Sequence, residues 1–141
     1  MARWLYFQTL SGPMYRIDIR WTDDPSIDTK ILSRHIELWF ETPPLGGTAM
    51  DAQGNIYFED LTSDAVRKLT PQRKVTTIIQ DSQLHWADAP WIWNGWLYLP
   101  EAQLDRIAPF QHGVSELPPS LSPGEGTSLA LIIGELSLPL D

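Results

Sequence analysis

A short motif occurs three times in the sequence, and this repeat limits the possible folds more than any other feature. Each copy is an apolar-aromatic-apolar triplet, followed by a polar stretch and then by a basic and an apolar residue. The triplets are Leu5-Tyr6-Phe7, Ile56-Tyr57-Phe58 and Leu97-Tyr98-Leu99, and the basic-apolar pairs are Arg16-Ile17, Lys68-Leu69 and Arg106-Ile107. The copies recur every 40 to 50 residues or so, roughly the length of four short strands with their turns.

The middle copy shows the expected secondary structure most clearly. Between residues 48 and 81, segments rich in β-branched and aromatic residues alternate with turn sequences at Gln53-Gly54, Thr62-Ser63 and Pro71-Gln72. Glycine supplies the positive φ that a tight hairpin needs, and β-branched residues favour strands. We therefore expect a four-stranded antiparallel meander over 48–81, with no helix between Asn55 and Ile79.

A repeat of four short strands at this period is typical of the blades of a β-propeller. The third copy repeats the pattern around the hairpin dipeptide Asn94-Gly95, and the first has no strand before its triplet. Between the first two copies, Pro25–Phe40 has apolar residues at helical spacing and predicts a helix. The sequence thus predicts an all-β fold of about two and a half to three propeller blades, with one helical insertion.

Composition excludes several classes of protein. The 18 acidic residues outnumber the 10 Lys and Arg, for a net charge of -8, which argues against a nucleic-acid partner because such binding relies on cations. The absence of Cys excludes disulfides and Cys-ligated zinc. The longest apolar run, residues 129–133, is far shorter than the ~20 residues that span a bilayer, so we expect no membrane partner. No signal peptide is evident at the N-terminus, and the compartment stays open.

The sequence from about Arg3 to Gly113 resembles the major royal jelly protein/Yellow family, and its bacterial branch most of all. Seven segments, which occur in the family's order, carry the resemblance. They are Pro44-Leu45-Gly46-Gly47-Thr48-Ala49-Met50-Asp51, Gly54-Asn55-Ile56-Tyr57-Phe58, Ile79-Gln80-Asp81, Leu84-His85-Trp86-Ala87-Asp88-Ala89, Asn94-Gly95-Trp96-Leu97-Tyr98-Leu99-Pro100, Gln103-Leu104-Asp105-Arg106 and Ala108-Pro109-Phe110. The resemblance implies a six-bladed propeller with a longer chain, in a secreted or periplasmic protein. The family's secretion signal and first blades would lie before Met1.

The C-terminal part does not resemble the usual end of that family. We therefore expect a partial six-bladed β-propeller over residues 1–117 and a divergent tail over 118–141. An open array of blades leaves sheet faces uncovered, which predicts self-association through those faces; a homodimer completing six blades is one arrangement. The apolar residues at 129–138 predict an edge strand or a segment packed on an exposed blade face. A loosely attached extension is the alternative.

Three residues are candidates for a ligand-binding site. Asp88 precedes the innermost strand of a blade, a position that lines the mouth of a propeller's channel. In the related senescence-marker/gluconolactonase propellers, an Asp in a similar context serves calcium binding and lactone hydrolysis, although alanines flank it here. The resemblance implies that Gln103 and Thr48 also face the channel. The structural alternatives are that Asp88 caps a turn and that the other two are exposed loop residues.

A carboxylate, an amide and a hydroxyl suit an amine or a hydroxylated aromatic ligand. We therefore expect a small-molecule-binding propeller fragment without catalysis and without a cofactor. Two alternatives stay open: a calcium-dependent lactonase or similar hydrolase, whose ion would need six to eight oxygen ligands, and an inactive truncated paralogue. Whether the chain is an enzyme is not decided by the sequence.

The aromatic and histidine residues each have a simpler interpretation. The Trp, Tyr and Phe residues are expected mostly to fill the space between sheets. The alternative for the tryptophans is an aromatic cage, of which strand alternation allows only some members to face one side. The cage residues would be Trp86, Trp91, Trp93 and Trp96. His35, His85 and His112 show no two-His metal spacing, although His85 and Asp88 could share a site.

Overall fold

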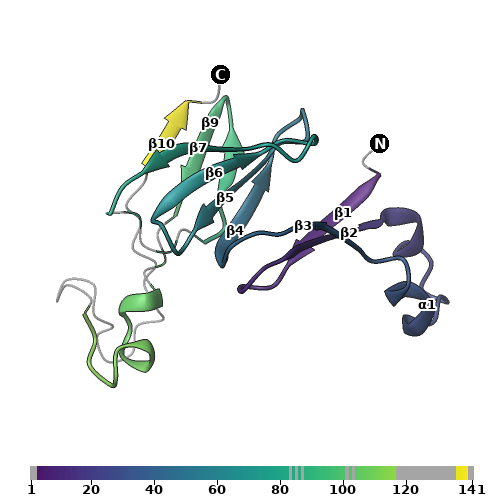
Figure 1. Ribbon diagram of the computed structural model, residues 1–141, viewed down its shortest axis with the longest axis horizontal. Helices are drawn as coiled ribbons and strands as arrows, with labels where there is room; N and C mark the ends of the chain where they lie inside the picture. The colour runs from purple at the N-terminus through teal and green to yellow at the C-terminus, as the bar shows by residue number, and fades with distance from the viewer. Residues whose placement is uncertain are drawn as a thin grey trace. The chain divides into compact units, whose positions relative to one another are not determined.

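In the computed structural model of the chain, antiparallel strands are the main secondary structure (Figure 1). It describes residues 3–82, 84, 86, 88–100, 102, 104–116 and 136–139. The strands form three sheets, and the chain divides into two compact units, residues 1–44 and 45–141. The expected all-β class with antiparallel meanders is therefore confirmed. None of the helices in the described part of the chain has the length and apolar character needed to cross a bilayer.

The N-terminal unit contains one three-stranded sheet with the order β1-β2-β3. Its elements are β1 (Trp4–Gln8), β2 (Met14–Asp18), the 3-10 helix η1 (Ile19–Trp21), α1 (Thr29–Ser33) and β3 (Glu37–Phe40). The first triplet lies in β1 and the first basic-apolar pair in β2, where Leu5 is opposite Ile17 and Tyr6 is opposite Arg16. The first repeat therefore forms the strand pair that the motif predicts.

The helix predicted for Pro25–Phe40 is mostly wrong. Only the five residues of α1 are helical, after Asp28 accepts a 2.7 Å hydrogen bond from the Lys30 N–H as the N-cap. Residues 37–40 form β3 instead, because Glu37 makes an ion pair of 2.9 Å with Arg16 on β2 and Trp39 is buried against Tyr6. Pairing with a neighbouring strand thus outweighs the weak helical periodicity.

The middle repeat forms a four-stranded meander, as predicted for residues 48–81. The strands pair in the order β4-β5-β6-β7, all antiparallel. They are β4 (Leu45–Met50), β5 (Ile56–Asp60), β6 (Ala65–Leu69) and β7 (Val75–Gln80). No helix interrupts Asn55–Ile79, all of which the structure describes, and the connections lie at the three predicted turns.

The turn between β4 and β5 is organised by the carboxylate of Asp51. It accepts hydrogen bonds from the backbone N–H groups of Gln53 and Asn55, from the Asn55 amide at 2.7 Å and from the Tyr57 hydroxyl at 3.0 Å. Burial would raise the pKa of Asp51, but these donors outweigh it and hold the pKa below its usual value. Burial and the neighbouring carboxylate raise the pKa of Tyr57 to about 12. Gly54, with φ 82°, completes the turn.

The third repeat forms a smaller sheet with the order β10-β9-β8. Its strands are β8 (Trp91–Trp93), β9 (Trp96–Leu99) and β10 (Leu136–Pro139). Asn94 and Gly95 both have positive φ, as a two-residue hairpin requires. The third basic-apolar pair does not lie in a strand, because Arg106 ends the 3-10 helix η2 (Leu104–Arg106) and η3 (Ala108–Phe110) follows at once.

The outer position of this sheet belongs to the C-terminal strand. Leu136 is opposite Leu99 and Leu138 is opposite Leu97 in an antiparallel ladder. The predicted edge strand within 129–138 is therefore present at its C-terminal end, and residues 129–135 lie outside the described residues.

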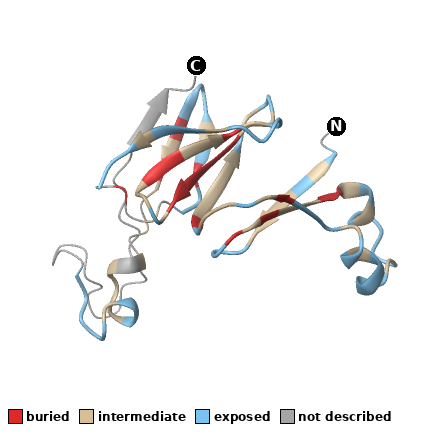
Figure 2. Ribbon diagram, in the orientation of Figure 1, coloured by how far each residue is buried: buried red, intermediate tan, exposed pale blue. Residues whose placement is uncertain are grey.

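The core of the C-terminal unit lies between its two sheets. One face of the meander, with Tyr57 and Val66, packs against Leu97 and Leu99 of β9 and against Leu84. Figure 2 shows the burial concentrated in the central strands, and β5 is buried along its whole length. The expectation that aromatic triplets fill the space between sheets therefore holds for Tyr57.

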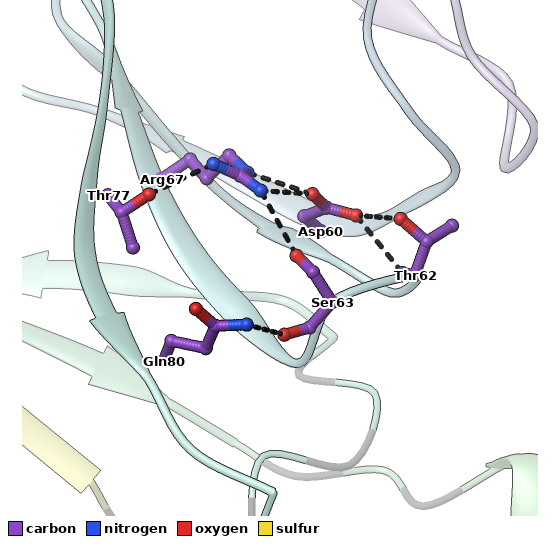
Figure 3. Close-up of polar contacts among 6 residues, drawn as sticks. All are labelled: Asp60, Thr62, Ser63, Arg67, Thr77 and Gln80. Atoms are coloured by element: carbon purple, nitrogen blue, oxygen red, sulfur yellow. Dashed lines mark hydrogen bonds and ion pairs between the residues drawn. The ribbon is translucent and has the colours of Figure 1, made fainter.

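Asp60, at the end of β5, is buried in a polar cluster (Figure 3). Its carboxylate forms an ion pair of 2.7 Å with the Arg67 guanidinium and accepts a hydrogen bond of 2.6 Å from the Thr62 hydroxyl. Arg67 also donates to the hydroxyls of Ser63 and Thr77. Burial raises the pKa of Asp60, but the hydrogen bonds from Thr62, Ser63 and Arg67 outweigh it and hold the pKa below its usual value. The cluster therefore joins β5, β6 and β7 at one end of the sheet.

Replacing Arg67 with Ala is expected to lower the free energy of unfolding by about 2–3 kcal/mol, because it removes two donors from a buried carboxylate. Urea denaturation measures this change. Lys74→Ala, at an exposed position in the turn between β6 and β7, is the control and should change stability by less than about 0.5 kcal/mol. Equal effects of the two substitutions would contradict the role given to the cluster.

The same cluster predicts a pH dependence. Because the pKa of Asp60 is lower in the folded than in the unfolded chain, its contribution to stability is present above the ordinary value of 3.8 and is lost as the pH falls through the folded value. Asp60→Asn should therefore reduce the loss of stability on acidification below about pH 4. Urea midpoints measured between pH 3 and pH 7 test this. If the midpoint falls with decreasing pH equally steeply in Asp60→Asn and in the parent chain, Asp60 does not contribute to the acid sensitivity of the fold.

Deleting residues 136–141 is expected to destabilise the C-terminal unit, because it removes the ladder partner of β9. The loss of four paired residues should lower the thermal midpoint by several degrees, at roughly 1 kcal/mol per hydrogen bond. Deleting only residues 140–141 is the matched control. An unchanged midpoint in the longer deletion would mean that β10 contributes nothing to the fold.

Candidate functional site

The segment before β8 has an unusual backbone. Trp86 and Ala89 both have φ of 56°, a left-handed conformation that costs a residue with a side chain of order 1 kcal/mol or more. Two backbone hydrogen bonds of 3.0 Å hold the segment against the chain after β9, from Asp88 N–H to the Pro100 carbonyl and from Ala102 N–H to the Trp86 carbonyl. These two backbone hydrogen bonds therefore hold the strained segment around Asp88 in place.

Asp88 is exposed at this position. Its Oδ1 accepts a hydrogen bond of 2.9 Å from the Ala89 N–H, which is the turn-capping role given above as the structural alternative. This single bond leaves the carboxylate accessible to solvent. The residue can therefore cap its turn and also present negative charge at the start of β8.

A close contact joins this segment to β4. A Cβ built on Gly47 would lie 2.4 Å from the Ala89 nitrogen and 2.5 Å from the Pro90 Cδ. Real Cβ atoms essentially never approach other atoms so closely, so only glycine allows β4 and the start of β8 to lie at this separation. Gly47 thus sets the spacing between β4 and the start of β8, the first strands of two successive repeats.

Thr48 lies in β4 directly after Gly47 and is half-buried. It is opposite Phe58, and its neighbour Ala49 packs against the core between the sheets. Because successive side chains alternate, Thr48 lies on the other face of the meander, with Phe58. The structure thus brings the backbones near Thr48 and Asp88 together through Gly47, with the Thr48 side chain on the face of the meander opposite Tyr57, where Phe58 is buried.

Gln103, the third predicted site residue, lies outside the described residues. The neighbouring Ala102 is the residue whose N–H bonds to Trp86. His85 also lies outside the described residues. Among the histidines that are described, His35 stacks on Trp21 with ring centroids 3.6 Å apart, and His112 is exposed in a turn.

Within the described part of the chain, no three His, Asp or Glu side chains gather as a metal site requires. The calcium-dependent alternative thus remains a prediction from the resemblance.

The tryptophans of the third repeat are more exposed than expected. Trp91, Trp93 and Trp96 share one face of the β8–β9 sheet with Tyr98, because Trp91 is opposite Tyr98 and Trp93 is opposite Trp96. Trp91 lies 5.7 Å from Tyr98 and 6.3 Å from Trp93 between ring centroids. Three of the four proposed cage residues therefore do face one side, but they line the open face of a sheet and do not form a cage. Trp86 instead contacts Phe110.

Sequence reasoning did not single out Gly47 or the Asp60 cluster. The signal for Asp60 was present, since an Asp at the end of an apolar strand, with Thr62 two residues later, is a common turn cap. The signal for Gly47 was ambiguous, because the contact it allows is with a segment forty residues away in the chain. No model of a known protein family matches the chain, and no curated protein matches it significantly.

Gly47→Ala is expected to destabilise the protein by roughly 2–4 kcal/mol, because the new methyl group would meet the backbone of Ala89 rather than a flexible side chain. Chemical denaturation measures the change. Gly95→Ala is an informative comparison because a Cβ there meets nothing within 4 Å and only the positive φ is unfavourable, so a loss of about 1 kcal/mol is expected. A smaller effect at Gly47 than at Gly95 would contradict the close approach.

Proposed function

We propose that the chain is a non-catalytic, small-molecule-binding part of a β-propeller of the major royal jelly protein/Yellow type. The ligand is an organic amine, with or without a hydroxylated aromatic ring, and Asp88 is the residue that attracts its positive charge. Gln103 and Thr48 are the further polar residues of the proposed site. The meander of β4–β7 is compatible with a propeller blade, and the partial six-bladed ring over residues 1–117 remains part of the proposal.

The observation that carries the proposal is an exposed carboxylate held in a strained backbone. Left-handed conformations at two residues with side chains, Trp86 and Ala89, cost free energy that a simple connection between strands could avoid. Such strain is common at binding sites, where interactions of the surrounding structure hold residues in an unfavourable but fixed geometry. Here it keeps Asp88 at the junction between the inner strands of two repeats.

The close packing at Gly47 gives a second line of support. Contact between β4 and the Ala89–Pro90 segment ties the start of one repeat to the start of the next. A ligand bound there would therefore meet backbone and side chains from two sheets, as sites at the junction of structural repeats commonly do.

Isothermal titration calorimetry with 4-hydroxyphenylethylamine tests the proposal. Asp88→Asn keeps an acceptor for the Ala89 N–H while removing the charge, so the fold should persist and the affinity should fall about two- to fivefold, the value of one exposed charge interaction. Asp23→Asn, at an exposed Asp of the N-terminal unit, is the control and should leave affinity unchanged. Phenol should bind equally to the parent chain and to Asp88→Asn, since it carries no positive charge.

Three results would count against the proposal. Absence of heat with the amine would remove the site, and equal affinities for the parent chain and Asp88→Asn would remove Asp88 from it. Calcium binding together with calcium-dependent hydrolysis of a simple lactone would favour the alternative hydrolase.

A further inference from the structure

The repeated triplet gives the central strand of each sheet two different faces. In β5, Tyr57 points to one face, and Ile56 and Phe58 point to the other, because side chains alternate along a strand. The same order of residues occupies β1 and β9. Each sheet therefore has a tyrosine face and a flanking-residue face, the latter carrying the two apolar residues on either side of the tyrosine.

The C-terminal unit contains one contact between such faces. Tyr57 of the meander packs in a single core with Leu97 and Leu99, the flanking residues of β9. The tyrosine face of one repeat thus packs on the flanking-residue face of the next. This contact defines which kind of face is complementary to which.

The tyrosine face of the third repeat and part of the flanking-residue face of the first repeat carry exposed apolar side chains. On the tyrosine face of the third repeat, beside Tyr98, Trp91 is 59%, Trp93 57% and Trp96 40% exposed. On the flanking-residue face of the first repeat, Leu5 is 48% and Leu38 51% exposed, whereas Ile17, opposite Leu5, is buried. Leu38 is there because it is opposite Tyr15, which is opposite Phe7.

We propose that the tyrosine face of the third repeat binds the flanking-residue face of the first repeat in a second copy of the chain. The contact repeats between molecules the one that Tyr57 makes with Leu97 and Leu99 within the molecule. It is heterologous, head to tail, so it produces closed rings or open chains of copies. It uses faces distinct from the proposed ligand site and does not depend on ligand binding.

The size of the exposed tyrosine face supports an interface. Each indole buries about 150–250 Å² when covered, so the three exposed ones present on the order of 300 Å². That is within the roughly 300–600 Å² of the largest apolar patches on monomeric proteins, which are often functional. It is also well under the ~800 Å² per partner of a standard interface, so association at micromolar rather than nanomolar concentration is expected.

The shape of the face favours protein side chains over a flat ligand. The Trp91 ring is tilted by 37° relative to Trp93 and by 34° relative to Tyr98. Tilted rings leave grooves between them, into which aliphatic side chains such as Leu5 and Leu38 can insert, whereas a flat ligand would need coplanar rings.

A mixing experiment with two variants tests the proposal. Trp93→Lys places a charge on the tyrosine face, and Leu38→Lys places one on the flanking-residue face. Each variant alone has lost one half of the contact and is expected to sediment as a monomer of 16.0 kDa. An equimolar mixture retains one intact face of each kind and is expected to form a heterodimer. The parent chain should show a mass that rises with concentration.

Sedimentation velocity between about 1 and 100 μM distinguishes the outcomes, a range set by the micromolar affinity expected from the interface area. Val114→Lys adds the same charge at an exposed residue outside the sheets and should associate like the parent chain. Far-UV circular dichroism checks that each variant is folded, and Trp93→Gln and Leu38→Gln replace any variant that is not.

Other results would overturn the proposal. A parent chain that stays monomeric over the whole range would exclude association. Persistent dimers of Leu38→Lys alone, lost only in Trp93→Lys, would indicate that two tyrosine faces bind each other. Association of both variants alone, at the level of the parent, would place the contact elsewhere.

Discussion

Burial of β5 along its whole length is the constraint on which the C-terminal unit depends. The strand carries Glu59 and Asp60 in addition to its apolar residues, and both carboxyl groups are almost completely buried. A buried carboxylate is tolerated only with close polar partners. For Asp60 they come from the turn after β5, with Thr62 and Ser63, and from Arg67 of β6. At the other end of β5 the turn residue Asp51 accepts the hydroxyl of Tyr57. The turn residues thus fix the loops and also make the central strand compatible with a dry core.

The meander was predictable because its information is local. Gly54 and the Thr62-Ser63 turn specify connections between strands that are adjacent in the chain, and β-branched residues fill the strands between them. The helix prediction failed where the information is not local. Residues 37–40 form a strand because they pair with β2, about twenty residues earlier, whose Arg16 binds Glu37, and because Trp39 packs on Tyr6 of β1. The apolar spacing within residues 25–40 carries no information about pairing with β2.

The sequence suggests candidate site residues but does not predict their geometry. Asp88 is a candidate because of its place before a predicted strand, and the left-handed backbone at Trp86 and Ala89 has no sequence signal, since neither residue is glycine. Which face of the meander Thr48 occupies depends on strand register, and a shift of one residue would reverse it. Register and long-range contact, as at Gly47, are properties of the folded sheet that composition and spacing do not encode.

The pairing of β10 with β9 has a consequence for the order in which the chain folds during synthesis. The other ladders of the described strands join strands that follow one another in the chain, so each can form once the second strand has emerged from the ribosome. The outer edge of β9, in contrast, has to wait for a strand that begins at Leu136, well beyond its own last residue Leu99. Until then an apolar sheet edge is open to other chains in the cell, and slow translation of the residues between these strands would prolong that exposure.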